Sequence, residues 1–365
     1  MNEKVIMAMS GGVDSSVAAL LLLEQGYDVI GITMKNWEFE SAGGNLNAES
    51  SCCSLGSIEN ARMVSTQLGI PHYVFDVSDS FKEKVIENFK SEYLAGNTPN
   101  PCVRCNYLIR WDTLLEKADV FDARYVATGH YARINRNSRN GSVELLTGID
   151  PDKDQSYVLW GLKQEDLKRT LFPLGELRKD AVRQKAEEAG LRTSKTPESF
   201  EICFIPDNDY RRYIRENVDG LEEMVPEGEI LDSDGEVLGI HSGYVNYTIG
   251  QRKGLGVTLG EPAYVIGIDP VSNTLTIGKK EDLMSTEFSL KDVNMMPGYE
   301  SEKSFRATVK IRHHHIGEEA LLQRNSARSW NVTFTHPAEA VAPGQSAVFY
   351  DSDRLLGGGI IEEVF

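Results

Sequence analysis

The stretch Ala8-Met9-Ser10-Gly11-Gly12-Val13-Asp14-Ser15-Ser16 decides the fold of the chain. It follows the apolar run Val5–Met7, which predicts a buried strand, and precedes Val17–Gln25, which predicts a helix ending at Gly26. A loop of small residues at this point brings the backbone close to a ligand, and the helix dipole favours an anion there. The three serines of the stretch add hydroxyl donors. We therefore expect the loop to bind a phosphate chain.

Two familiar phosphate-binding loops are excluded by the same stretch. It has neither the Gly-Lys-Ser/Thr ending of the P-loop nor the G-x-G-x-x-G dinucleotide fingerprint. Ser-Gly-Gly-Val-Asp-Ser, at positions 10–15, instead resembles the pyrophosphate loop of the ATP-pyrophosphatase superfamily. That resemblance implies cleavage of ATP between its α and β phosphates and adenylation of a substrate oxygen. The blander alternative is an ordinary glycine-rich turn.

Length and composition describe a globular protein of two or three domains. The chain has 365 residues, of which 41% are hydrophobic, and its apolar runs are too short for a membrane span. The N-terminus has no basic-then-apolar leader, so secretion is not indicated. Five cysteines, an odd number, favour reduced thiols in the cytoplasm. We expect a cytoplasmic protein with no membrane partner.

The net charge of −17 argues by itself against a nucleic-acid partner, but the charge is uneven. Asp207–Glu236 carries eleven acids and three bases, which favours a solvated face or a contact with a partner protein. Ser301–Trp330 carries six bases, three acids and three consecutive histidines, and Pro101–Arg139 carries seven bases against four acids. Local basic surfaces on an acidic chain therefore leave RNA possible as a partner.

Strands alternating with helices in the first half predict an α/β fold with a doubly wound parallel sheet. The expected strands are Val5–Met7, Asp28–Met34, His72–Asp76 and Arg124–Ala127, and the expected helices after the first are Ile58–Leu68, Phe81–Tyr93, Asn106–Ala118 and Arg178–Gly190. Ligands of such sheets lie at the carboxyl ends of the strands. The polar loop between Trp37 and Cys53 is expected to cover a nucleotide.

The pattern of residues along the chain changes after about residue 205. Short β-rich runs with many glycines predict a small central α+β domain, and short strands alone predict a C-terminal β-barrel. The expected strands of that barrel include Phe305–Lys310, Asn331–Phe334, Ala347–Tyr350 and Gly359–Val364. We expect three domains: a catalytic domain over 1–205, a central domain over 206–285 and a barrel that contacts RNA over 286–365.

Several longer motifs agree with one family. In chain order they are the loop at 10–15, Asn97-Thr98-Pro99-Asn100-Pro101-Cys102-Val103-Arg104-Cys105-Asn106, Thr128-Gly129-His130-Tyr131, Lys153-Asp154-Gln155-Ser156-Tyr157, Ile202-Cys203-Phe204-Ile205, Tyr247-Thr248-Ile249-Gly250-Gln251-Arg252-Lys253-Gly254 and Pro343-Gly344-Gln345-Ser346-Ala347. Over essentially its whole length the chain resembles the bacterial tRNA-specific 2-thiouridylases. The short loop alone would also admit GMP, NAD or argininosuccinate synthetases.

The resemblance implies a reaction and its partners. The family replaces oxygen by sulfur at C2 of the wobble uridine in the anticodon loop of tRNAs for Lys, Glu and Gln. ATP, with Mg²⁺, adenylates that oxygen, and a cysteine persulfide delivers the sulfur. The sulfur comes from a donor protein, either a cysteine desulfurase or a sulfur relay protein. Adenylation is reasonable chemistry because a carbonyl oxygen is a poor leaving group and an adenylate is a good one.

The resemblance also assigns residues. Cys105 would be the catalytic nucleophile and Cys203 the persulfide carrier. The residues expected to bind ATP are Ala8, Met9, Ser10, Gly11, Gly12, Val13, Asp14, Ser15 and Met34, with Gly129 near the adenine. The residues expected to bind tRNA are Asn100, Pro101 and Cys102 at the target base, together with His130, Lys153, Asp154, Gln155, Arg312, His313 and Gln345.

The cysteines leave an alternative mechanism open. Many relatives have Asp at the position of Cys102, so this chain carries Cys102-x-x-Cys105 as well as Cys203. Three thiols could hold an iron–sulfur cluster, and a zinc site would also need the adjacent pair Cys52 and Cys53, which otherwise reads as packing. The persulfide route needs reactive thiols, and we expect Cys105 just before a helix that begins at Asn106, where a thiol pKa is lowered.

Other features have two interpretations each. Asp14 is either close to a bound metal or the cap of the first helix. His313-His314-His315 favours an RNA-facing surface over a metal site, because alternate residues of a strand face opposite sides. For the whole chain, the alternatives to a tRNA thiolase are a small-molecule ATP-dependent ligase and a non-enzymatic RNA-binding protein. Neither explains the cysteines together with the phosphate loop.

Overall fold

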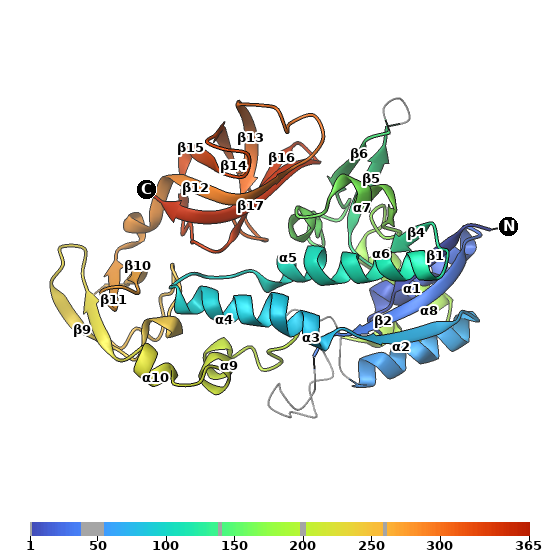
Figure 1. Cartoon of the computed structure of the whole chain (residues 1–365), viewed down its shortest axis with the longest axis horizontal. Helices are drawn as coiled ribbons and strands as arrows, with labels where there is room; N and C mark the ends of the chain where they lie inside the picture. Colours follow the sequence, from blue (N-terminus) through green and yellow to red (C-terminus); the bar gives the residue numbers. More distant parts are fainter. Residues whose placement is uncertain (1, 38–54, 138–140, 198–201, 258–260) are drawn as a thin grey trace. The chain divides into compact units, whose positions relative to one another are not determined.

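A computed structural model of the chain describes residues 2–37, 55–137, 141–197, 202–257 and 261–365. These residues form two compact units (Figure 1). Unit 1 contains residues 1–85, 102–209 and 353–355, and unit 2 contains residues 86–101, 210–352 and 356–365. The expected loop between Trp37 and Cys53, including Cys52, lies outside the described residues.

Unit 1 is built on a five-stranded parallel sheet in the order β3-β2-β1-β4-β7. The strands are β1 (Lys4–Ala8), β2 (Asp28–Lys35), β3 (His72–Asp76), β4 (Tyr125–Ala127) and β7 (Thr170–Leu171). Residues of β1 are fully buried at Val5, Ile6 and Met7, as expected for a central parallel strand. The order reverses beside β1, and this is where ligands of open parallel sheets bind. The predicted parallel α/β sheet is confirmed.

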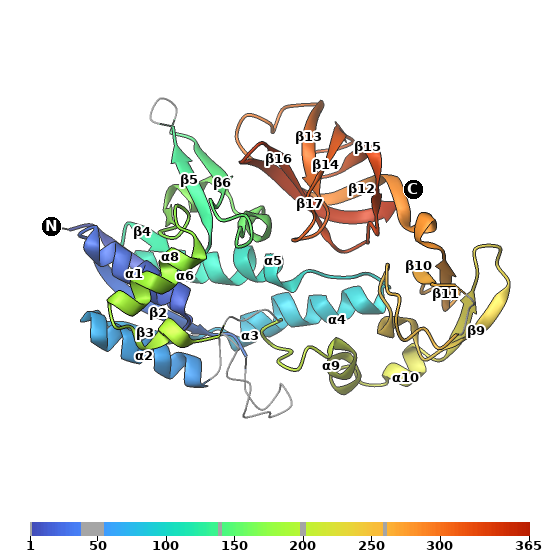
Figure 2. The same ribbon diagram turned by 180° about the vertical axis from the view of Figure 1, so that it is seen from behind.

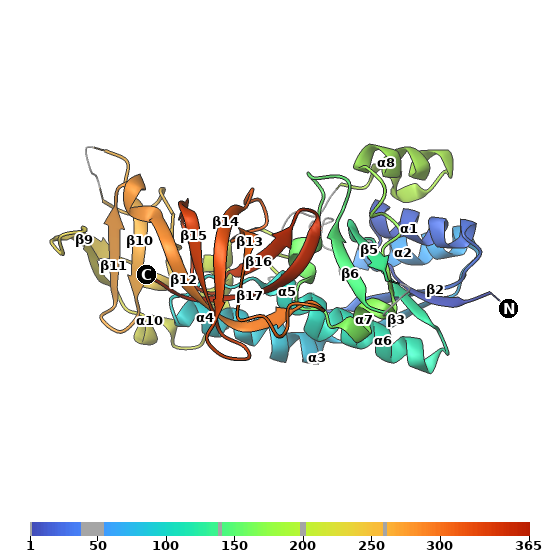
Figure 3. The same cartoon turned by 90° about the horizontal axis from the view of Figure 1, so that it is seen from above.

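Helices cover both faces of this sheet (Figure 3). The helices α1 (Val13–Glu24), α2 (Leu55–Leu68) and α8 (Lys179–Glu188) share one apolar cluster with β1, and α6 (Trp111–Val120) packs against β1 and β4. A hairpin of β5 (Ala132–Arg136) and β6 (Val143–Thr147) follows β4, and α7 (Gln164–Lys168) precedes β7. The first loop therefore opens at the carboxyl end of β1, between packed helices.

The first helix starts earlier than the sequence predicted. We expected it from Val17, but α1 begins at Val13, directly after Gly12. Gly12 is the N-cap residue in an extended conformation, and its carbonyl accepts bonds from the amide and hydroxyl of Ser16. Polar residues at the start of a helix hide the apolar periodicity, which appears only from Val17 onward. Asp14 and Ser15 consequently belong to the first turn of α1.

The helix around the cysteines also begins earlier than expected. It runs through α5 (Pro101–Cys105), a π-helical turn (Asn106–Arg110) and α6, so Cys105 lies inside the helix and not before it. Proline is favoured at the first helical position, because its missing amide would have no intrahelical partner there, and Pro101 occupies that position. The prediction that a helix N-terminus acts directly on Cys105 is wrong. Cys102, in the first turn, occupies that position instead.

Unit 2 contains a helix, a small sheet and a barrel. Helix α4 (Glu87–Leu94) follows α3 (Ser78–Phe81) and a π-helical turn (Lys82–Ile86) in the chain. The sheet has the order β10-β11-β8-β9 and is accompanied by two short helices. Its elements are α9 (Tyr210–Asn217), α10 (Leu221–Met224), β8 (Gly228–Leu231), β9 (Val237–His241), β10 (Tyr264–Asp269) and β11 (Thr274–Gly278).

The C-terminal part of unit 2 is a closed six-stranded barrel, which confirms the predicted β-barrel (Figure 2). Its antiparallel order is β12-β15-β14-β13-β16-β17, and β12 pairs with β17 to close it. The strands are β12 (Met284–Met295), β13 (Ser304–Lys310), β14 (Glu318–Arg324), β15 (Trp330–Glu339), β16 (Ser346–Asp351) and β17 (Arg354–Val364). Alternating buried residues such as Phe288, Leu290, Val332 and Phe349 fill its interior.

Within the described ranges, we find no helix with the length and apolar character needed to cross a membrane.

Candidate active site

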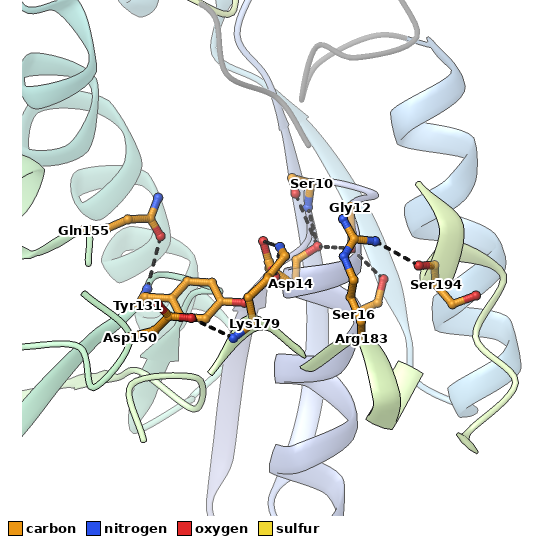
Figure 4. Close-up of polar contacts among 11 residues, drawn as sticks. Ser10, Gly12, Asp14, Ser16, Tyr131, Asp150, Gln155, Lys179, Arg183 and Ser194 are labelled. Atoms are coloured by element: carbon orange, nitrogen blue, oxygen red, sulfur yellow. Dashed lines mark hydrogen bonds and ion pairs between the residues drawn. The ribbon is translucent and has the colours of Figure 1, made fainter. Parts of the chain in front are cut away.

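The loop after β1 forms a compact turn whose serines bond within the loop (Figure 4). The hydroxyls of Ser15 and Ser16 donate to the carbonyl of Gly12 at 3.1 and 2.8 Å, and the amide of Ser10 donates to Ser15 Oγ at 3.2 Å. The first turn of an α-helix leaves backbone amides without intrahelical partners, so the loop retains a positive helix end for an anion. The serines therefore shape the loop in this structure, and their hydroxyls must turn if they are to reach a phosphate.

Asp14 is the centre of a charged contact in the first turn of α1. Lys179 Nζ donates to Asp14 Oδ1 at 2.7 Å and to Oδ2 at 2.8 Å, and the hydroxyl of Tyr131 donates to Oδ1 at 2.7 Å (Figure 4). Lys179 is only 8% exposed, whereas the side chain of Asp14 is 33% exposed. Since Gly12 is the N-cap, Asp14 is not the capping residue. The pair fixes a carboxylate and a buried ammonium next to the phosphate loop.

The backbone amides of both partners of Asp14 are themselves hydrogen-bonded to other side chains. The amide of Lys179 donates to Asp150 Oδ2 at 2.9 Å, and the amide of Tyr131 donates to Gln155 Oε1 at 3.1 Å. Neither Lys179 nor Tyr131 was among the expected site residues. They lie 165 and 117 positions from Asp14, so no local pattern indicates the contact. For Tyr131 the only signal in the sequence is that its motif follows the carboxyl end of a predicted strand, where ligands of such sheets bind.

Gly129 touches the start of α1. A Cβ at this position would lie 3.0 Å from both Asp14 C and Ser15 N, which are backbone atoms. Backbone cannot give way as a flexible side chain does, so glycine is needed here for the close approach of the β4 end to α1. Met34, another expected ATP ligand, lies in β2 and is half-buried.

Replacing Gly129 with alanine should weaken ATP binding by about tenfold or more, because the added methyl group displaces the helix end that holds Asp14 and Ser15. Equilibrium binding of ATP measures this effect. Gly26→Ala is the matched control, since a Cβ there meets nothing within 4 Å and only backbone strain is added at the far end of α1. Equal ATP affinities of the two variants would contradict the packing role of Gly129.

The three described cysteines belong to unit 1 and differ in exposure. Cys102 is exposed, Cys105 is buried and Cys203 is half-buried, and none forms a disulfide. Across the described ranges, which exclude Cys52 and Cys53, no group of three or more His, Cys, Asp or Glu side chains could hold a metal ion. The iron–sulfur alternative is therefore not supported. The cysteines remain candidates for thiol chemistry.

A buried hydrogen-bond network follows Cys105. Arg110 donates to Asn106 Oδ1 at 2.5 Å and lies 3.2 Å from His130 Nε2. Because a guanidinium only donates, Nε2 accepts, and the proton on Nδ1 goes to Thr128 Oγ1 at 2.7 Å. Burial, and then the charge of Arg110, holds the pKa of His130 well below its ordinary value. His130 is thus a neutral, 8% exposed side chain that links the helix of Cys105 to the end of β4.

The residues expected to contact tRNA differ in their exposure and in the hydrogen bonds that they make within the protein. Asn100, Lys153 and His313 are half-buried, Pro101 is buried, and Cys102 and Arg312 are exposed. Asp154 accepts bonds from Gly148 and Ser156, Gln155 accepts from Tyr131, and Arg312 donates to the carbonyl of Glu339. Gln345 donates to the carbonyls of Thr98 and Pro99. Several of these side chains therefore bond within the protein.

A parallel sheet with this loop at its switch point defines a nucleotide-binding protein of the ATP-pyrophosphatase type. Family profiles match three consecutive regions: the tRNA methyl transferase HUP domain over residues 3–207, the tRNA methyl transferase PRC-barrel domain over 219–279 and the aminomethyltransferase beta-barrel domain over 285–361. The chain belongs to the family of tRNA-specific 2-thiouridylases. The relatives that place it there match it over nearly its whole length.

The tRNA-specific 2-thiouridylase MnmA of Salinibacter ruber is 48% identical over 99% of this chain and 94% of its own length. The protein of the same name from Clostridioides difficile is 45% identical over 100% of this chain and 99% of its own length. Likeness to solved structures is lower: a 4-thiouridine synthetase–RNA complex with bound ATP gives a TM-score of 0.36 at 16% identity, covering 59% of this chain and 50% of that chain.

Proposed function

We propose that the chain is an ATP-dependent tRNA-uridine 2-sulfurtransferase. It adenylates the C2 oxygen of the wobble uridine in tRNAs for Lys, Glu and Gln and replaces that oxygen with sulfur, releasing AMP and pyrophosphate. The observation that carries the proposal is that a pyrophosphate-type loop, with its Asp14–Lys179 pair, shares unit 1 with Cys105 and Cys203. A ligase for a small molecule would need the loop but would leave the cysteines unexplained.

The ATP half of the reaction is assigned to residues 8–15, Met34 and the region of Gly129. The positive end of α1 orients the phosphates, and the buried ammonium of Lys179 adds positive charge beside them. Bound together with ATP, Mg²⁺ would neutralise phosphate charge, and the partly exposed Asp14 carboxylate is a hard oxygen ligand of the kind this ion prefers. The protein itself contributes position and electrostatics, with little acid–base chemistry.

The sulfur half is assigned to Cys203 as persulfide carrier and Cys105 as nucleophile. The Cys105 thiolate attacks Sγ of the Cys203 persulfide, the sulfur–sulfur bond breaks, and hydrosulfide leaves. Hydrosulfide adds to C2 of the adenylated uridine and AMP departs, so the oxygen leaves on the nucleotide. A Cys105–Cys203 disulfide remains, and a dithiol reductant must restore both thiols. Direct attack by the terminal persulfide sulfur is the alternative route.

The partners follow from this chemistry. A cysteine desulfurase or a sulfur relay protein would load Cys203, and the reaction would take place in the cytoplasm, where tRNA and reduced thiols occur together. The test is to incubate the protein with ATP, a persulfide donor and unmodified tRNA, and to measure 2-thiouridine, AMP and pyrophosphate by mass spectrometry and chromatography. Binding of tRNA without turnover of ATP would favour an RNA-binding protein and overturn the proposal.

Arg312 and Lys153 are proposed to face RNA phosphates. Replacing either with alanine should weaken tRNA binding and reduce the slope of log affinity against log salt concentration by about one unit per contact, because fewer counterions are released. Titrations over a range of salt concentrations measure the slope. Arg328→Ala is the control on the same barrel as Arg312, since Arg328 is 73% exposed and pairs with Asp292. Slopes equal to that of the control would contradict these phosphate contacts.

A further inference from the structure

The segment Asn97–Pro101 links the end of α4 to the helix that carries Cys102 and Cys105. Its start is fixed by Glu92, whose carbonyl accepts the amide of Asn97 at 2.9 Å and whose carboxylate accepts Asn97 Nδ2 at 2.8 Å. Pro99 and Pro101 have no amide hydrogen, so the segment has few donors of its own for backbone pairing. Its carbonyl groups therefore depend on donors from elsewhere in the fold.

Those donors come from the loop between β15 and β16 of the barrel, residues 343–345. Gln345 Nε2 donates to the carbonyl of Thr98 at 2.9 Å and lies 3.4 Å from that of Pro99. In the reverse direction, the amide of Thr98 donates to the carbonyl of Pro343 at 2.8 Å. Two carbonyls can be satisfied only by the NH₂ group of an amide, so the orientation of Gln345 is set by its partners.

The 343–345 loop is anchored to the barrel. The amide of Gly344 donates to the carbonyl of Ile361 at 2.9 Å, and the amide of Ile361 donates to the carbonyl of Gln345 at 2.8 Å. Gly344 has φ +88°, and a Cβ there would lie 3.0 Å from Asn97 Cβ and from the carbonyl oxygen of Thr98. The close approach thus requires glycine, and Ile361, on β17, ties the loop to a fully buried part of the barrel.

We infer that the 343–345 loop is a positioning device, in which Gln345 holds the Asn97–Pro101 backbone in the conformation that presents the half-buried Asn100 to the target uridine. The second half of this inference rests on the proposed function. Gln345 acts on the reaction through the segment it bonds, and this role differs from a direct contact between its side chain and tRNA. The barrel thereby supports the segment that leads into the catalytic cysteines.

Hydrogen exchange without tRNA tests the contact itself. Gln345→Glu removes the NH₂ group and places a carboxylate against two carbonyl oxygens, so the Thr98 amide should exchange about tenfold faster or more. Gln345→Met removes the donor without adding charge and should accelerate exchange in the same direction. Gln323→Glu is the matched control, because Gln323 is an exposed glutamine of β14 in the same barrel and is not bonded to the segment. Exchange of Thr98 in both Gln345 variants at the rate of the control would overturn the inference.

Turnover and tRNA affinity separate positioning from direct RNA contact. A positioning role predicts that kcat for 2-thiouridine formation falls about tenfold in Gln345→Met while the Kd for tRNA changes by less than about twofold. A rise in Kd with unchanged Thr98 exchange would show that Gln345 touches RNA directly and would overturn the positioning role. If the wild type forms no 2-thiouridine, the proposed function fails, but accelerated exchange in the two variants still establishes the contact.

Discussion

Replacing Cys203 with serine should abolish formation of 2-thiouridine when a persulfide donor supplies the sulfur. A hydroxyl cannot carry a persulfide, so the sulfur has no carrier on the enzyme. Cys105→Ser should be inactive as well on the hydrosulfide-release route, because the carrier persulfide then has no thiolate to reduce it. Mass spectrometry of nucleosides from the reacted tRNA measures the product, and a loss of at least about a thousandfold is expected for both variants.

Cys102 provides the internal control for these two variants. It is exposed in the first turn of its helix, and the sulfur route gives it no bond to make or break. Cys102→Asp should keep substantial activity, because the sulfur route requires no thiol at this position. If Cys102→Ala loses as much 2-thiouridine formation as Cys105→Ser, this assignment is contradicted. A Cys105–Cys203 disulfide, detected after a single turnover without reductant, would support the release route.

Lys179→Met should reduce ATP-dependent pyrophosphate formation by roughly a hundredfold. The substitution leaves the Asp14 carboxylate without its ammonium partner and therefore places an unbalanced negative charge beside the phosphate seat. The same substitution should lower the free energy of unfolding: breaking a fully buried ion pair costs about 3–5 kcal/mol of stability, and the partial exposure of Asp14 reduces this to about 2–3 kcal/mol. The rate effect has a separate cause: removing one group that stabilises developing charge at a reaction site typically lowers the rate by about 100-fold or more.

A double-mutant cycle makes the charge argument specific. Lys179→Met combined with Asp14→Asn removes both charges, so it should bind ATP more tightly than Lys179→Met alone. Asp14→Asn alone completes the cycle, and Asp14→Asn and Asp14→Ala should each lose adenylation while tRNA still binds. Lys185→Met, on the same helix α8, is the control for loss of a lysine and should leave pyrophosphate release unchanged. An ATP affinity of the double variant no better than that of Lys179→Met would contradict charge imbalance as the cause.

The sequence was informative where the physical signal is local. A run of apolar residues, a glycine-rich turn and a helical pattern predicted the sheet around β1, and short alternating strands predicted the barrel. The start of the helix at Pro101 was missed although a local signal existed, namely proline at the first helical position. The error mattered because it moved the helix N-terminus from Cys105 to the neighbourhood of Cys102.

The contacts that complete the site could not be predicted in this way. Lys179 reaches Asp14 across 165 positions, and Gln345 reaches Thr98 across 247. The sequence of a charged amphipathic helix predicts that its lysines are solvated. Lys179 is only 8% exposed because α8 packs against α1. Likewise, the fixed neutral tautomer of His130 depends on Arg110, which lies on another element. Tertiary packing, and not local pattern, decides each of these roles.

The π-helical turn Asn106–Arg110 also determines how the helix around it tolerates insertions and deletions. A π turn contains one residue more than an α turn, so it changes the angular phase between Cys105 and the buried face of Trp111, Leu114 and Ala118. Deleting one residue within 106–110 would restore regular α geometry with nearly the same phase, whereas α geometry over all five residues would rotate the Cys105 side of the helix by about 100° relative to that face. Loss of the π geometry at unchanged chain length would thus turn the thiol away while the core packing stayed, so the backbone geometry of this turn is as critical as residue identity.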